Sequence, residues 1–198
     1  MNGARSTLEG SPGAEPSLPG KVTAIHGALR SAKIPHAIGG ALALAYYAEP
    51  RATIDVDVNV FVSPERWQDV VEALAALGVD AGKLDPDALR RDGQCRLWWG
   101  DNPVDLFFAN AEIHEAMRKG VRRAPFAEGT IPILAPEHLA VCKAMFDRPK
   151  DWLDIEQMLV ATSPLDLEEI KGWLERMVGK DDPRMGRLLE VESSLSGD

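Results

Sequence analysis

The sequence lacks long hydrophobic runs and has little cysteine, and each absence excludes a class of protein. No apolar stretch approaches the roughly 18 residues that a membrane-spanning helix needs. The N-terminus also lacks the basic-then-apolar pattern of a secretory signal. The two cysteines, Cys95 and Cys142, lie far apart and outside any metal-ligand spacing. We therefore expect a reduced, cytoplasmic protein with no membrane association.

Positive charge is also scarce, because 22 lysines and arginines face 31 aspartates and glutamates and the net charge is −9. This balance argues against a generic nucleic-acid coat protein. The last 48 residues hold 12 acidic and five basic side chains, and so carry −7 of the total. The preceding residues are close to neutral, which leaves room for a local basic surface. The basic residues closest together there are Arg118, Lys119, Arg122 and Arg123.

The chain is long enough for one good hydrophobic core, and its composition is that of a globular protein. Residues 1–18, rich in Gly, Pro and Ser, are predicted to form a disordered tail. Residues 19–135 are predicted to form an α+β core, a small mixed, twisted sheet flanked by helices. Residues 136–198 are predicted to form a helical subdomain that completes a cleft. The elements expected in the core are helices over 19–33, 41–49, 63–78 and 111–118 and strands over 53–62, 94–99, 103–108, 121–126 and 130–134.

Two carboxylates interrupt the most strand-like segment, "TIDVDVNVFV". With a strand period of two, Asp55 and Asp57 project from one face, roughly 7 Å apart along the strand. Like charges this close repel each other, and burial makes the repulsion worse. A divalent cation would offset that cost, because Mg²⁺ prefers hard oxygen ligands. Asp105 lies in a second strand, and three carboxylates on neighbouring strands can hold two metal ions. The competing interpretation is a solvated face of an exposed strand.

A pair of glycines precedes the first of these strands. Gly39 and Gly40 stand between a short predicted strand and an apolar helical run, where backbone N–H groups can approach a phosphate. Gly-Gly alone is also common in ordinary turns. The specific signal is the whole set, Gly-Gly, then a helix, then Asp-x-Asp, then a later strand Asp.

This set resembles the nucleotidyltransferase superfamily that shares its palm with DNA polymerase beta. The later stretch "LAPEHLAVCKAMFDRPKDWLDIEQML" resembles the AbiEii and MenT-type toxin nucleotidyltransferases, which carry a lysine on one helix and an aspartate on the next. The resemblance covers about residues 34–160. Ala41 departs from the pattern, since many superfamily members have a serine after the glycine. The residues that match the family's motifs are Gly39, Gly40, Asp55, Asp57, Asp105, Lys143 and Asp154.

The resemblance implies a role for each of these residues. Asp55, Asp57 and Asp105 would hold Mg²⁺, with Mn²⁺ as a substitute, and Asp105 would help to deprotonate the attacking hydroxyl. Gly39, Gly40 and Lys143, together with Arg51, would bind the NTP. Lys143 and Asp154 come from successive helices because "DRPKD" separates them. Asp154 could pin Lys143, pin Arg148 or touch a ribose, and the sequence leaves that choice open.

The function implied is transfer of NMP from an NTP to the 3′ end of tRNA, releasing pyrophosphate. Such a protein would act as the toxin of a toxin–antitoxin pair that blocks translation, and it would have a cognate antitoxin. Arg118, Lys119, Arg122 and Arg123 are the candidate RNA-binding surface, and a solvated basic turn explains them equally well. The alternative acceptors are a small molecule, such as an antibiotic, and a protein side chain. A third hypothesis is a binding module whose carboxylates are relics.

One residue near the carboxylates is a candidate for regulation. Thr53 precedes Asp55 by two residues, and a phosphate there would add roughly two negative charges where the nucleotide phosphates must bind. Phosphorylation of Thr53 is therefore predicted to switch activity off. The plain alternative is an ordinary threonine of the strand.

Overall fold

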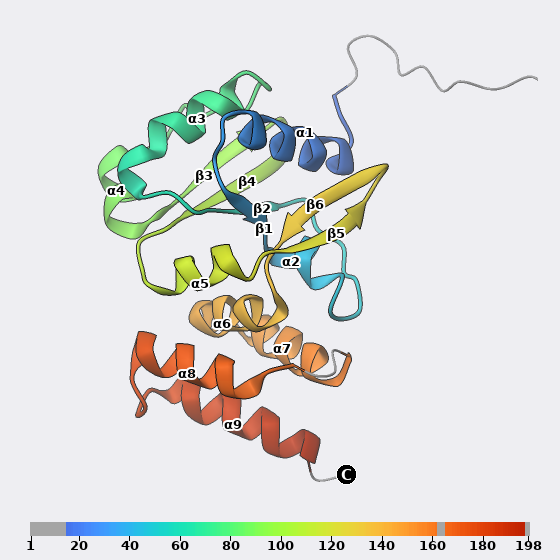
Figure 1. Cartoon of the computed structure of the whole chain (residues 1–198), viewed down its shortest axis with the longest axis vertical. Coiled ribbons are helices and arrows are strands. Elements are labelled where there is room, and N and C mark those ends of the chain that lie inside the picture. The colour runs from blue at the N-terminus through green and yellow to red at the C-terminus, as the bar shows by residue number, and fades with distance from the viewer. Residues whose placement is uncertain (1–14, 162–164, 197–198) are drawn as a thin grey trace, which may run out of the picture.

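The computed structural model describes residues 15–161 and 165–196, so most of the expected N-terminal tail lies outside the described residues. The sheet and its flanking helices form an α+β fold with a helical C-terminal part (Figure 1), as the sequence predicts. The strands are β1 (His36–Ile38), β2 (Val56–Val60), β3 (Gln94–Trp99), β4 (Asn102–Phe108), β5 (Arg122–Phe126) and β6 (Gly129–Ile133). The helices are α1 (Leu18–Ser31), α2 (Gly40–Leu44), the 3-10 turn η1 (Pro64–Arg66), α3 (Trp67–Ala75), α4 (Pro86–Asp92), α5 (Ile113–Lys119), α6 (Pro136–Phe146), α7 (Pro149–Ala161), α8 (Leu167–Val178) and α9 (Pro183–Ser196).

The six described strands form one mixed sheet in the order β3-β4-β2-β1-β6-β5. Strand β2 runs parallel to β4 and antiparallel to β1, whereas β3 runs antiparallel to β4. Strands β2 and β4 therefore lie at the centre of the half of the sheet that carries the carboxylates. This central placement fixes which side chains share a face, because residues that alternate along a strand point to opposite faces.

One face of the sheet packs into the hydrophobic core. Val56, Val58 and Val60 of β2 are completely buried, and alternate residues of β4, Val104 and Leu106, are buried with them. Figure 1 shows α1 and α3 on this side of the molecule, with α6 to α9 stacked beyond the opposite side. The intervening residues of β2 and β4 consequently face the helical C-terminal part.

Two predicted elements differ from the structure, and one helix has no predicted counterpart. Strand β2 is shorter than 53–62, because its pairing with β4 begins only at Val56, and Ile54 is 62% exposed rather than buried. Helix α2 ends at Leu44, because the amides of Tyr46 and Tyr47 bond to carbonyls three residues back, and the Tyr47 hydroxyl donates to the Leu134 carbonyl. Helix α4 was not predicted, although Asp85 caps its first turn and Pro86 occupies its first position.

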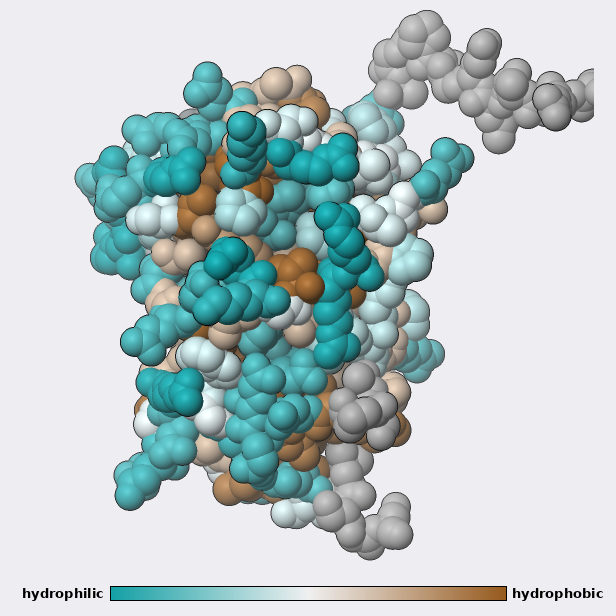
Figure 2. Space-filling view, in the orientation of Figure 1, coloured by the Kyte–Doolittle hydropathy of each residue, from teal (hydrophilic) through white to brown (hydrophobic). Residues whose placement is uncertain are grey.

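The surface is mostly hydrophilic on the face shown in Figure 2, with brown hydrophobic patches in its upper half and near the centre. No helix in the described part of the chain is long and apolar enough to cross a membrane. Helices α6 and α7 pack directly on one another, and α8 packs on α6. The helical C-terminal part is thus joined to the sheet through α6, which also contacts α2.

Two buried histidines connect α1 to the sheet. The Nδ1 atom of His36 lies 2.8 Å from the Ile34 carbonyl, so Nδ1 carries the proton and Nε2 accepts a hydrogen bond of 2.9 Å from His26. Burial lowers the pKa of His36 from 6.5 to about 4, because desolvation outweighs the hydrogen bond to Ile34. Burial also lowers the pKa of His26, with Arg30 and Arg123 adding to the effect.

The histidine pair predicts a loss of stability in acid. Both pKa values are lower in the folded chain, so the unfolded chain binds more protons and stability falls as the pH drops from 6.5 towards 4. We expect His36→Gln to remove part of that slope, amounting to about 3 kcal/mol over this range. Thermal melting of both proteins between pH 7.5 and 4.5 measures it. Identical slopes for the two proteins would contradict the assignment.

Candidate active site

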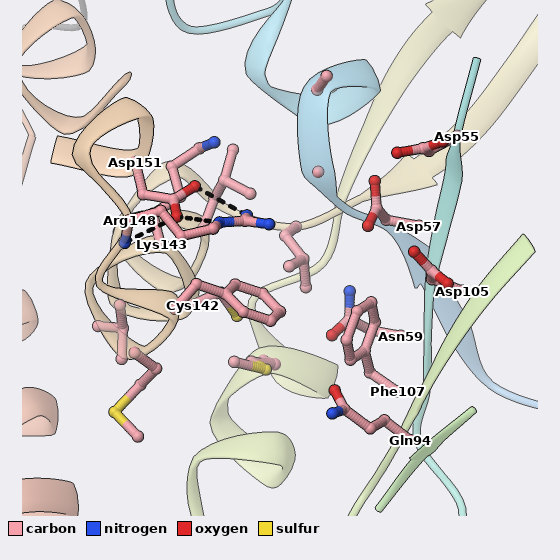
Figure 3. A pocket seen from close by; sticks show the side chains of 18 of the residues that line it. Asp55, Asp57, Asn59, Gln94, Asp105, Phe107, Cys142, Lys143, Arg148 and Asp151 are labelled. Carbon is pink, nitrogen blue, oxygen red and sulfur yellow. Dashed lines mark hydrogen bonds and ion pairs between the residues drawn. The ribbon is translucent and has the colours of Figure 1, made fainter. Parts of the chain in front are cut away.

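The three predicted carboxylates lie together on the face of the sheet that looks towards the helical part. The parallel register of β2 and β4 places Asp57 directly opposite Asp105. Asp55 lies on the same side, immediately before the start of β2. Figure 3 shows Asp55, Asp57 and Asp105 in one row along a wall of a cavity. The cavity has a volume of about 640 Å³, and all three side chains line it.

Gly39 and Gly40 make space for this row. Gly40 has φ +54°, and a Cβ atom there would overlap the Asp57 carboxylate. A Cβ at Gly39 would lie 2.7 Å from the Asn59 amide nitrogen, and the Gly39 N–H donates to the Asp57 carbonyl at 2.9 Å. Both glycines are therefore needed to bring the chain against Asp57 and Asn59. Phosphate binding by this turn remains a prediction.

Cationic side chains form the wall opposite the carboxylates, around the connection between α6 and α7. Arg148 donates a forked pair of hydrogen bonds to the buried Asp151, at 2.6 and 3.0 Å. Lys143 and Arg148 act on Asp57 across the cavity, since both lower its pKa. Figure 3 shows Lys143, Arg148 and Asp151 facing the three carboxylates. One wall is therefore negative and the other positive.

Asp154 holds the predicted lysine in place. Lys143 and Asp154 are both buried, and their ion pair measures 2.5 Å. Arg51 donates to the same carboxylate oxygen at 3.3 Å. Of the alternatives that the sequence left open, the structure selects the pair with Lys143, while Asp151 takes Arg148. Arg51 and Lys143 both line the cavity, and nucleotide binding by them remains a prediction.

Asp57 lies in an environment that disfavours its negative charge. Burial raises the pKa of its carboxyl group from 3.8 to about 6, and the negative charges of Asp105 and Asp55 raise it further, in that order. Lys143 and Arg148 oppose the shift without cancelling it. A cation between these carboxylates would relieve the repulsion that the protein itself leaves.

The residues present fit a divalent cation at Asp55 and Asp57, but Asp105 is already engaged. Arg96 donates to both oxygens of Asp105 at 2.7 Å each. Among the described residues no group of three His, Cys, Asp or Glu side chains has the geometry of a metal site. The structure thus brings the three predicted carboxylates to one cavity, but it does not arrange them with the geometry of a metal site. A metal ion at Asp105 would have to share these carboxylate oxygens with Arg96 or displace it.

The far end of the cavity is apolar and aromatic. Phe107 follows Asp105 by two residues on β4 and meets Phe146 of α6 edge to face, with ring centroids 5.8 Å apart. Met117 of α5 and Met177 of α8 also line this end. Cys95 and Cys142 line the cavity as free thiols, and burial raises the pKa of each to about 12. Neither cysteine is therefore suited to act as a nucleophile at neutral pH.

The remaining predicted residues lie around this cavity. Thr53 lines it, and its hydroxyl oxygen accepts a hydrogen bond of 3.1 Å from the Asp55 amide. Arg118 and Lys119 pair with Glu115 on α5, whose earlier residues line the cavity. Neighbouring residues of a strand point to opposite faces, so Arg122 and Arg123 diverge on β5. Arg122 pairs with Glu137, while the charge of Arg123 acts on His26. The four basic residues therefore do not form one continuous surface.

Sequence reasoning did not identify several cavity residues. Arg96 is not among the predicted site residues, yet β3 and β4 pair it directly with Asp105. Asn59 shares the strand face of Asp57 and could have been included by the same period of two. Phe107 likewise shares the strand face of Asp105, two residues further along β4. Gln94, Arg96 and Phe146 carry no local signal, because only pairing and helix packing bring them to the cavity.

Comparison with known proteins shows the fold. No protein-family model matches the chain, and no curated protein matches it by sequence. The antibiotic-resistance factor ANT(2'')-Ia superposes with a TM-score of 0.58 and 16% identity, over 93% of this chain and 100% of that one. The lincosamide antibiotic adenylyltransferase LnuA, with lincomycin bound, gives 0.50 and 13%, over 72% of this chain and 96% of that one. The chain therefore shares its fold with these two proteins, and the α+β fold expected from the sequence is confirmed. The comparisons do not assign an AbiEii or MenT subtype.

The raised pKa of Asp57 predicts that this residue destabilises the metal-free chain. The folded chain holds the proton more tightly than the unfolded one, so stability falls as the pH rises from 3.8 through 6. Asp57→Asn should therefore increase the free energy of unfolding at pH 7.5 by about 1 to 3 kcal/mol. Chemical denaturation in EDTA measures this effect.

Asp101→Asn, in an exposed turn, is the matched control and should leave stability nearly unchanged. Addition of Mg²⁺ should stabilise the wild type and not Asp57→Asn. A less stable Asp57→Asn protein at pH 7.5 would contradict the electrostatic account.

Proposed function

We propose that this protein transfers NMP from an NTP to an acceptor hydroxyl, releasing pyrophosphate. The observation that carries the proposal is the opposition of two charged walls across one cavity. The Asp57–Asp105 register and Asp55 form the negative wall, and Lys143 with Arg148 lies on the positive one. A metal-bound triphosphate needs both, oxygen ligands for the cation and positive charge for the phosphates. The nucleotidyltransferase fold agrees with this chemistry.

The residues of the chain divide the reaction between them. Asp55 and Asp57 would hold Mg²⁺ or Mn²⁺, which when bound neutralises phosphate charge and makes the acceptor hydroxyl more acidic. Arg148, Lys143 and Arg51 would hold the triphosphate against the α6–α7 wall. Asp105 would accept the proton as the acceptor oxygen bonds to the α-phosphorus and the bond from that phosphorus to the β-phosphate oxygen breaks. Asp151 and Asp154 keep the cationic side chains in position.

For the acceptor we propose the 3′ end of tRNA. The far end of the cavity has an aromatic pair, Phe107 and Phe146, on which a terminal base could stack. Apart from Asp55 and Asp57, the carboxylates that line the cavity are each paired with an arginine, Asp92 with Arg91, Asp105 with Arg96 and Asp151 with Arg148. With a cation bound the cavity is net positive, which favours an anionic or neutral acceptor over a polycation.

The biological role proposed is that of a toxin that blocks aminoacylation and is neutralised by a cognate antitoxin. Arg118 and Lys119, which extend the cavity-lining helix α5, would contact the tRNA backbone. Arg122 and Arg123 would contribute on separate faces of β5. These residues would make activity fall steeply with salt.

A second candidate is nucleotidyl transfer to a small molecule such as an antibiotic. The acidic net charge of −9 favours it, because most of the surface repels RNA. The two superposed proteins are described as an antibiotic-resistance factor and an antibiotic adenylyltransferase, although these likenesses extend only to the fold. Incubation with labelled NTPs distinguishes this acceptor, and a protein side chain, from RNA.

End-labelling separates these acceptors. The purified protein should incorporate label from one of the four NTPs into the 3′ end of tRNA, and Asp57→Ala should lower the rate by at least about a thousandfold. Asp101→Asn should label at the wild-type rate. Label in protein or in an added antibiotic would replace the RNA proposal. No label anywhere, with no thermal shift on adding Mg²⁺ and NTP, would support a non-enzymatic binding module.

Thr53 provides a test of regulation. We propose that phosphorylation there switches activity off, because it would add about two negative charges to the carboxylate wall, beside the Asp55 amide that donates to the Thr53 hydroxyl oxygen. Thr53→Glu should lower labelling at least about tenfold, while the uncharged Thr53→Val stays within a few-fold of wild type. Full activity of Thr53→Glu would contradict the switch, as would an inactive, antitoxin-treated sample whose intact mass shows no phosphate.

A further inference from the structure

Arg96 lies next to the carboxylate row and places a positive charge beside Asp105. The register of three strands places Asp57, Asp105 and Arg96 side by side across the sheet. Asp105 thus lies between a crowded carboxylate on one side and a guanidinium on the other. Both of its oxygens accept hydrogen bonds from Arg96, at 2.7 Å each. Forked pairs of this kind are among the stronger hydrogen bonds that proteins form.

The two members of this pair differ in their freedom to move. The Asp105 side chain is 16% exposed, whereas the Arg96 side chain is 52% exposed. Arg96 comes from β3, which is an edge strand of the sheet. Arg96 can therefore swing into solvent without leaving its own charge buried. Asp105 cannot leave the cavity wall, because β4 is paired on both sides.

We propose that Arg96 is a positioning residue that competes with a divalent cation for Asp105. In the metal-free chain the guanidinium neutralises Asp105 and occupies both of its oxygens. When a cation binds, Asp105 exchanges Arg96 for the metal, and Arg96 turns towards solvent. The inference rests on the proposed function, since it concerns the same metal site. It assigns to Arg96 control over cation affinity and over when Asp105 becomes available as a base.

The competition has a measurable sign. Mn²⁺ binding, followed by the electron paramagnetic resonance signal of the free ion at low ionic strength, should tighten about three- to tenfold in Arg96→Gln. Arg96→Lys keeps the charge without the fork and should lie between Arg96→Gln and wild type. Arg66→Gln, which removes the partner of Asp69 on the distant helix α3, should bind Mn²⁺ as wild type does.

A double-mutant cycle separates competition for Asp105 from a general effect of removing positive charge. In an Asp105→Asn background, Arg96→Gln should change Mn²⁺ affinity less than about twofold, because the shared carboxylate is gone. An equal gain in both backgrounds, or no gain in the wild-type background, overturns the inference while leaving the proposed metal site intact. Binding by Arg96→Gln alone supports competition. No binding by either protein, when melting shows both folded, overturns the inference and the metal-dependent function together.

Discussion

Repulsion among three carboxylates is the constraint on which the rest of this structure depends. Asp57 is largely buried, lies beside Asp105 in the strand register and is near Asp55, and these factors, in that order, raise its pKa to about 6. A sheet built for stability alone would place apolar side chains at such central positions. The chain also leaves out side chains at Gly39 and Gly40 so that the carboxylate fits. Both features cost stability, which is typical of a site kept for binding or chemistry.

Most charged side chains around the cavity have an ion-pair partner, and at Asp55 and Asp57 a bound cation would balance the negative charge. On the helical wall, Asp154 holds Lys143 and Asp151 holds Arg148, so the cationic groups are fixed before any substrate binds. In the described part of the chain, Asp105 is the one carboxylate of the sheet wall with an arginine partner, which leaves Asp55 and Asp57 to repel each other. Preorganised charges of this kind act without rearranging during a reaction, which makes them more effective than mobile ones. Arg96, from the edge strand β3, is the arginine that we propose exchanges its carboxylate for a cation.

Local pattern predicted the elements that have a strong periodicity or an end signal. The alternation around Asp55 and Asp57 predicted β2 and its cavity face, and the strands β3 to β6 lie within a residue or two of their expected ranges. The prediction failed where tertiary contacts override local preference. Helix α2 stops early because Tyr47 reaches the Leu134 carbonyl, and Ile54 is exposed because no strand pairs with it. Asp85-Pro86 is a sufficient local signal for the start of α4.

The sequence by itself determined that carboxylates would share one strand face and that a lysine and an aspartate would come from successive helices. It could do so because side-chain direction along a strand, and the interruption of a helix by proline, are local properties of the chain. Only the tertiary structure decided that Asp105 is paired with Arg96, that Asp154 holds Lys143, and that Phe107 meets Phe146. Those contacts depend on strand order, register and helix packing, which bring together residues that are separate in the sequence.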